Sequence, residues 1–109
     1  MYRYPRAVFL ATVRSNDDTG STLLLSGELD LAAAPEFRRA LRSLGSGPVV
    51  VDLSGVTFLD SVGVGLLIGA DRRAREAGGR LTLVVGPGSA RQVLVACGVD
   101  RIVSIVDPR

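Results

Sequence analysis

The sequence contains no histidine and no lysine, and each absence excludes a kind of chemistry. Without histidine the chain lacks the usual triad base, the commonest metal ligand and the proton shuttle for physiological pH. All thirteen basic residues are arginine, which excludes a Walker-type phosphate-binding lysine and a Schiff-base lysine. We therefore expect a protein that is not an enzyme, with no catalytic residues, no metal site and no cofactor.

Cysteine and long apolar runs are also scarce. Cys97 is the single cysteine, so neither an internal disulfide nor a cysteine zinc cluster can form, which fits a reducing compartment. No apolar run approaches the ~20 residues that span a bilayer, and the N-terminal stretch MYRYPRAVF lacks the features of a secretory signal. We expect a cytoplasmic protein that does not bind membranes.

The length and charge are those of a small globular domain. The chain has 109 residues and a net charge of +2, with basic residues scattered along it rather than clustered. We therefore predict one domain over residues 1–109, with 1–6 and 107–109 loosely ordered, and no direct binding to nucleic acid. A monomer or a weak dimer is expected.

The order of apolar patterns predicts alternating strands and helices. Residues 7–14 and 22–25 are predicted strands, and the turn residues at 15–20 between them indicate an antiparallel hairpin. Further strands are predicted at 48–53, 81–85 and 102–106, and helices are predicted to start at Pro35, Ser61 and Ser89. This series predicts a single α/β domain with a mixed, mostly parallel sheet, an antiparallel N-terminal hairpin and helices packed on one side.

The third predicted helix carries two specific expectations. Ser89 is its candidate N-cap, and Cys97 falls on its apolar stripe with Ala90, Val93 and Leu94. Cys97 is therefore expected to be a structural residue of the core.

Ser61 stands where the second predicted helix begins. It follows a strand and a loop and precedes an apolar helical run, which is the position of an N-cap that accepts a backbone N–H. A helix N-terminus is also a favourable place for a phosphate group, because unpaired N–H groups and the helix dipole both attract negative charge. If Ser61 only caps the helix, however, it stabilises the fold and has no further function.

The first two turns of this helix are predicted to be a docking surface. The expected core face leaves Ile68 nearly opposite and Val62 and Val64 on its flanks. Gly63, Gly65 and Gly69 each cost about 1 kcal/mol relative to alanine in a helix interior. Close approach of either the sheet or a partner would offset that cost. The core face is predicted to consist of Gly63, Leu66, Leu67, Ala70, Ala74 and Ala77.

Four short segments, in this order, give the sequence a family resemblance. They are Gly27-Glu28-Leu29-Asp30, Asp60-Ser61-x-Gly-x-Gly, Gly78-Gly79-x-Leu and Gly98-Val99. Together they resemble the bacterial anti-sigma factor antagonists of the STAS-domain family, which implies a STAS-like fold.

The resemblance also implies a function. In that family, a partner that is both anti-sigma factor and serine kinase phosphorylates the serine that corresponds to Ser61. The unphosphorylated protein would bind this partner and free the sigma factor, and phosphorylation would switch binding off. Val62 replaces the second hydroxyl that members often carry. The residues expected to bind the partner are Asp30, Asp60, Val62, Val64, Gly65 and Ile68.

Two other functions remain open at this point. The chain could be a STAS-type regulatory or scaffold subunit of a transporter or a stress-signalling complex, with Ser61 only capping its helix. Alternatively, the loop Gly86-Pro87-Gly88 could bind a nucleotide or a small apolar ligand, although such glycines are more often a helix entry loop.

Overall fold

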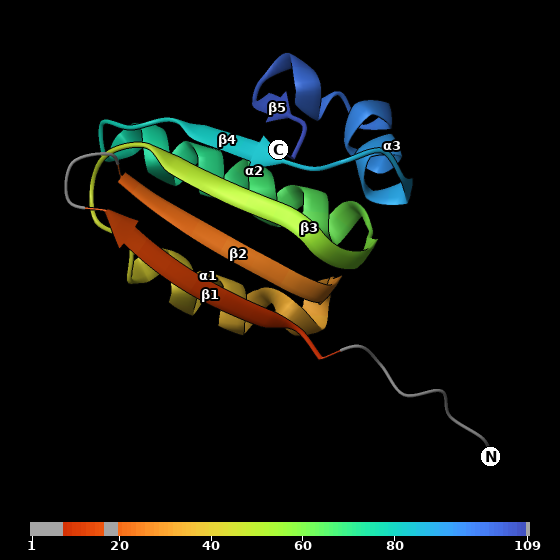
Figure 1. Ribbon diagram of the computed structural model, residues 1–109, viewed down its shortest axis with the longest axis horizontal. Helices are drawn as coiled ribbons and strands as arrows, with labels where there is room; N and C mark the ends of the chain where they lie inside the picture. Colours follow the sequence, from red (N-terminus) through yellow and green to blue (C-terminus); the bar gives the residue numbers. More distant parts are fainter. Residues whose placement is uncertain (1–7, 17–19, 109) are drawn as a thin grey trace.

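The computed structural model describes residues 8–16 and 20–108, which form a five-stranded sheet with three α-helices (Figure 1). The strands are β1 (Leu10–Asn16), β2 (Gly20–Leu29), β3 (Val49–Leu59), β4 (Leu81–Val84) and β5 (Ser104–Val106). The helices are α1 (Ala34–Arg42), α2 (Ser61–Glu76) and α3 (Ser89–Ala96), and two 3₁₀ turns are η1 (Leu31–Ala33) and η2 (Val99–Arg101).

The sheet is mixed and mostly parallel. Its strand order is β1-β2-β3-β4-β5; the β1 and β2 pair is antiparallel and the other neighbouring pairs are parallel. Asn16 lies opposite Gly20, so the predicted hairpin is confirmed, whereas residues 17–19 of its predicted turn lie outside the described residues. The predicted α/β fold class is therefore confirmed.

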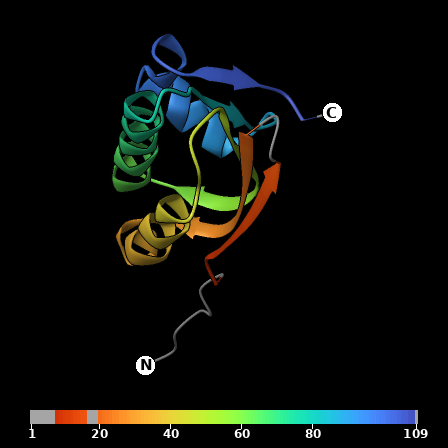
Figure 2. The ribbon, with the colours of Figure 1, turned by 90° about the vertical axis from the view of Figure 1, so that its left-hand side faces the viewer.

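One face of the sheet forms the core with the helices. Every second residue of β2, from Ser21 to Leu29, is buried, as the two-residue period of a strand requires. Phe37 of α1, Leu67 of α2 and Leu94 of α3 are fully buried in the same cluster. Figure 2 shows α1 and α2 beside each other on one side of the sheet. The core of the domain thus lies between this face and the helices.

Strands β2 and β3 are longer than their apolar patterns predict. The predicted strands end at residues 25 and 53, whereas β2 continues to Leu29 and β3 to Leu59. The added segments pair with each other in parallel, with register shifts near Ser26 and Gly27. These polar and glycine-containing segments are stabilised by pairing with the neighbouring strand. The local sequence pattern of one strand cannot predict such pairing.

Both ends of α3 differ from the predictions. Gly88, at φ 147°, is the N-cap, and Ser89 is the first helical residue, so the predicted Ser89 cap is wrong. That backbone conformation favours glycine over any residue with a Cβ. Cys97 is exposed rather than buried in the core, because α3 ends at Ala96 and Gly98 then turns the chain at φ 75°.

The ends of the chain are described only in part. Residues 1–6 and 109, for which loose order was predicted, lie outside the described residues. Asp107 is described and forms an ion pair with Arg91 of α3. Within the described ranges, no helix has the length and apolar character that crossing a membrane requires.

Candidate functional site

Two aspartates lie at the edge of the sheet where β2 and β3 end. Leu29 and Leu59 are register partners in this parallel pair, so the next residues, Asp30 and Asp60, reach the same edge. Each aspartate then begins a helical segment: its Oδ1 accepts a backbone N–H two or three residues later, at 3.1 Å for Asp30 and 3.0 Å for Asp60. The extensions of β2 and β3 thus position the start of η1 beside the start of α2.

Asp60 is the N-cap of α2, so the prediction that Ser61 caps this helix is wrong. Asp60 has an extended backbone (φ −118°, ψ −172°), which lets its carboxylate reach the N–H of Gly63. Ser61 is already the first helical residue, and its side chain is exposed. Among the described residues, the Ser61 hydroxyl has no hydrogen-bond partner. It is therefore open to modification from solvent.

Gly63 holds the start of α2 directly against the sheet. A Cβ atom at this position would lie 2.2 Å from the carbonyl oxygen of Leu29 and 2.5 Å from Cδ1 of Leu59. Only glycine fits such a close approach without displacing the backbone. The first of the three glycines is thus explained by contact with the sheet, and this contact fixes the position of Ser61 relative to Asp30.

Three large apolar side chains are exposed within two residues of these aspartates. The exposed fractions are 73% for Leu31, 46% for Phe58 and 39% for Val62. The sequence analysis selected only Val62. A signal for the other two was present, because each is a large apolar residue next to a polar helix start and outside the predicted strands and helices.

Val64 is buried, so its prediction as a surface residue is wrong. Its exposed fraction is 5%, and Asp71, two turns later on the same flank, is buried as well. The buried positions of α2 span an arc of roughly 160°, wider than the stripe of about 100° that a simple amphipathic helix shows. Ala77, predicted to be in the core, is instead the exposed C-cap residue.

The remaining predicted partner-binding residues retain some exposure. Val62 and Gly65 are exposed, whereas Asp30, Asp60 and Ile68 are partly buried. Ile68 packs against the core with one side of its side chain. Of the predicted partner-binding residues, Val64 is thus the one that is buried.

The Ser61 hydroxyl lies without an adjacent base among the described residues. A serine nucleophile needs an adjacent base, and the Ser61 hydroxyl has no hydrogen-bond partner in the described part of the chain. Within residues 8–16 and 20–108, no group of three or more acidic or cysteine side chains is arranged to hold a metal ion.

The glycine loop before α3 lines a separate cavity of about 470 Å³, together with residues of β3. Gly88 of this loop caps α3, so the loop serves as a helix entry. None of the side chains lining the cavity is charged. A nucleotide phosphate would therefore find no arginine there to neutralise it.

The chain is similar to known proteins over most of its length. Residues 12–106 match the family model described as "Mlab, STAS domain". Osmosensory protein A of Mycobacterium tuberculosis (strain ATCC 25618 / H37Rv) is 32% identical over 79 residues, which are 71% of this chain and 50% of that protein. The anti-sigma-B factor antagonist of Listeria monocytogenes is 30% identical over 74 residues, which are 65% of each chain. The match thus spans between half and about two thirds of these relatives.

A solved structure shows the same fold. The unphosphorylated form of the Bacillus anti-sigma factor antagonist SpoIIAA superposes with a TM-score of 0.75 at 23% identity. The superposition covers 92% of this chain and 89% of that chain.

Proposed function

This chain belongs to the STAS-domain family, and from that premise we propose that it is an anti-sigma factor antagonist controlled at Ser61. The unphosphorylated protein binds a kinase-type anti-sigma factor and so frees the sigma factor. Phosphorylation of Ser61 by that partner switches binding off. The observation that carries this proposal is the exposed Ser61 hydroxyl, which has no hydrogen-bond partner among the described residues and follows directly on the Asp60 cap.

The relatives support this proposal. The Listeria monocytogenes protein is an anti-sigma-B factor antagonist. SpoIIAA, whose fold this chain shares, has been solved in both an unphosphorylated and a phosphorylated form. We extend both properties to this chain, with Ser61 as the modified residue.

The apolar side chains near Ser61 supply a surface for the partner. Leu31, Phe58 and Val62 are exposed here, and burying exposed apolar area is the main favourable term in most protein association. The hot spots of an interface are typically such desolvated anchors near its centre. In our proposal, these three residues surround Ser61 in the interface, and Asp30, Asp60, Gly65 and Ile68 complete the contact surface.

A phosphate on Ser61 would oppose docking without unfolding the domain. It adds about 1.5 to 2 negative charges next to Asp60, at the sheet edge that also carries Asp30. The first turn of α2 tolerates an anion, because its backbone N–H groups and dipole favour negative charge. Desolvating the same anion inside an interface costs several kcal/mol unless the partner supplies a cation. Phosphorylation should therefore abolish binding and leave folding intact.

The capping role of Asp60 bears on the alternative function. In the alternative, a scaffold or transporter subunit, the only role of Ser61 would be to cap α2. In the structure Asp60 caps this helix instead. We therefore favour the antagonist, acting in the cytoplasm as a monomer or a weak dimer without direct contact to nucleic acid or membrane.

Binding to the kinase-type anti-sigma factor, measured by isothermal titration calorimetry, tests the proposal. Wild type and Ser61→Ala should bind with similar affinity, whereas Ser61→Asp and protein incubated with the partner and ATP should bind at least tenfold more weakly. Mass mapping should place the phosphate on Ser61. Ser89→Ala is the matched control, because Ser89 is also an exposed first residue of a helix. Equal binding by phosphorylated and unmodified protein would contradict the mechanism.

A further inference from the structure

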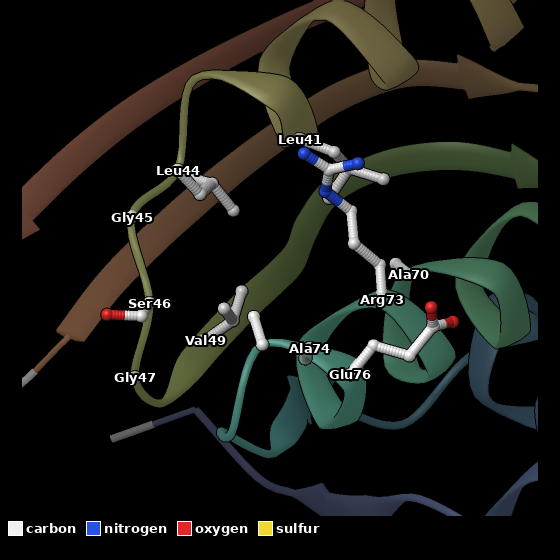
Figure 3. Close-up of a pocket in the computed structure, with 11 residues that line it drawn as sticks. Leu41, Leu44, Gly45, Ser46, Gly47, Val49, Ala70, Arg73, Ala74 and Glu76 are labelled. Atoms are coloured by element: carbon white, nitrogen blue, oxygen red, sulfur yellow. The ribbon is translucent and has the colours of Figure 1, made fainter.

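A groove runs between α1 and α2 on the outer side of the helix layer. Two neighbouring cavities of about 360 and 320 Å³ share Leu41, Ala70 and Arg73 as lining residues, so they form one continuous depression. Figure 3 shows the part of this groove that lies toward the end of α2, with the Arg73 side chain extending from α2 toward Leu41 of α1. Apolar side chains form much of its wall.

Arginines without ion-pair partners line the groove. Arg38 and Arg42 of α1 and Arg73 of α2 are exposed, and none of them forms an ion pair within the described ranges. Arg39 and Arg75, by contrast, pair with carboxylates of their own helices. Glu76 is the one acidic residue that lines the groove, at its far end. The groove therefore has a net positive charge that nothing in the described chain neutralises.

Two glycines of α2 line the same groove. Beyond the adjacent backbone of α2 itself, a Cβ atom at Gly65 or Gly69 would meet no atom within 4 Å, unlike one at Gly63. Intramolecular packing therefore does not explain why these positions lack a side chain, although glycine lowers the stability of a helix interior relative to alanine. Gly65 and Gly69 lie four residues apart, in the row that would otherwise form a ridge along the helix. The space along this row of the helix is therefore open on the side of the groove.

We propose that an acidic, amphipathic helix of the anti-sigma factor packs into this groove, over Gly65 and Gly69, with its carboxylates against Arg38, Arg42 and Arg73. Helices associate by placing the ridge of one into the groove of another, and arginine forms bidentate contacts with carboxylates. The proposal rests on the proposed function for the identity of the partner. It extends the surface around Ser61, which already includes Gly65, along α2 into the groove.

A second copy of this chain does not fit the groove by charge. On each of α1, α2 and α3, arginines outnumber acidic residues. A helix of another copy would therefore bring more positive charge against Arg38 and Arg73. The charge of the groove requires a partner helix of opposite sign.

Two variants test the proposal in the same titration with the anti-sigma factor. Arg38→Glu/Arg73→Glu should weaken binding about thirtyfold at low ionic strength, and less as salt is added. The control Arg80→Glu/Arg101→Glu makes the same change in net charge at exposed positions outside the groove, and should change affinity less than about threefold.

Gly65→Ala/Gly69→Ala should weaken binding about tenfold, because the two methyl groups occupy the space of the incoming helix. The same variant should raise the folding equilibrium constant about fourfold for each glycine replaced. Weaker binding together with greater stability excludes misfolding as the cause. Gly86→Ala is the control, because Gly86 lies outside the groove and a Cβ atom there would meet only Pro108, at an ordinary contact distance of 3.6 Å.

The outcomes separate this inference from the proposed function. If wild type binds the anti-sigma factor and phosphorylation of Ser61 abolishes binding, but either groove variant binds as wild type does, the groove proposal is overturned and the switch stands. If wild type does not bind the anti-sigma factor at all, both proposals are overturned.

Discussion

Gly63 of α2 and Leu29 of β2 are in direct backbone contact, with the Leu29 carbonyl oxygen 2.2 Å from the place of a Cβ atom at Gly63. Real Cβ atoms essentially never approach an oxygen so closely, so any side chain at residue 63 must displace backbone. The contact joins the end of the strand that leads to Asp30 with the helix that begins at Ser61. The geometry of the site therefore depends on this glycine.

Gly63→Ala should lower the free energy of unfolding by about 2 kcal/mol, because overpacking against backbone outweighs the gain in helix propensity. Gly69→Ala is the control in the same helix: its methyl group meets open space, so it should raise the free energy of unfolding by up to about 1 kcal/mol. Urea denaturation measures both values. Similar changes in the two variants would contradict the close approach at Gly63.

The capping assignment predicts different effects for Asp60 and Ser61. Asp60→Ala removes the carboxylate that accepts the Gly63 N–H and should lower the free energy of unfolding by about 1 kcal/mol. Ser61→Ala removes an exposed hydroxyl without a hydrogen-bond partner in the described chain and should change it by less than about 0.5 kcal/mol. Urea denaturation again gives the comparison. If Ser61→Ala lowered the free energy of unfolding more than Asp60→Ala does, Ser61 rather than Asp60 would be the cap.

The elements predicted correctly are those whose burial follows a simple period. The apolar spacing of Phe37, Ala40 and Leu41 in α1, for example, corresponds to one buried face. The extension of β3 to Leu59 could not be predicted in this way, because it depends on pairing with β2 rather than on its own side chains. The position of the site at the sheet edge follows from that pairing.

The candidate site was predicted in position but not in detail. Ser61 was correctly placed at the start of α2, yet a local pattern could not decide whether Asp60 or Ser61 supplies the cap. Val64 was misassigned because α2 is buried over a wider arc than its own pattern suggests. Leu31 was missed because a residue of a 3₁₀ turn follows no periodic pattern, although a large apolar side chain directly after Asp30 was a signal.

Leu31 offers a test of the apolar surface around Ser61. Its side chain is 73% exposed, so Leu31→Ser should change the free energy of unfolding by less than about 0.5 kcal/mol. In our proposal it is an anchor in the interface, and its loss should weaken binding to the anti-sigma factor about tenfold. Calorimetric titration measures that change. Ile102→Ser is the control, because Ile102 is 53% exposed and precedes β5, at the opposite end of the parallel strands. If Leu31→Ser and Ile102→Ser lowered the affinity equally, Leu31 would not be an anchor and the interface would lie away from it.

Asp71 is a buried carboxylate on the flank of α2 that also buries Val64. Its side chain is 5% exposed, and the Arg75 guanidinium lies 2.8 Å from its Oδ2, although no well-aligned hydrogen bond reaches that oxygen within the described residues. The Arg75 side chain is itself 56% exposed, so solvent screens part of the attraction.

Removing Arg75 would leave the buried charge of Asp71 without its cation, which is costlier than losing a surface pair. Arg75→Ala should therefore lower the free energy of unfolding by about 1 kcal/mol, whereas Arg72→Ala, at an exposed position, should change it by less than about 0.5 kcal/mol. In a chain that carries Asp71→Asn, the Arg75→Ala substitution should lose most of its effect, because a neutral amide needs no counter-charge. Urea denaturation of the four members of this double-mutant cycle gives the coupling, and a coupling near zero would show that solvent rather than Arg75 compensates Asp71.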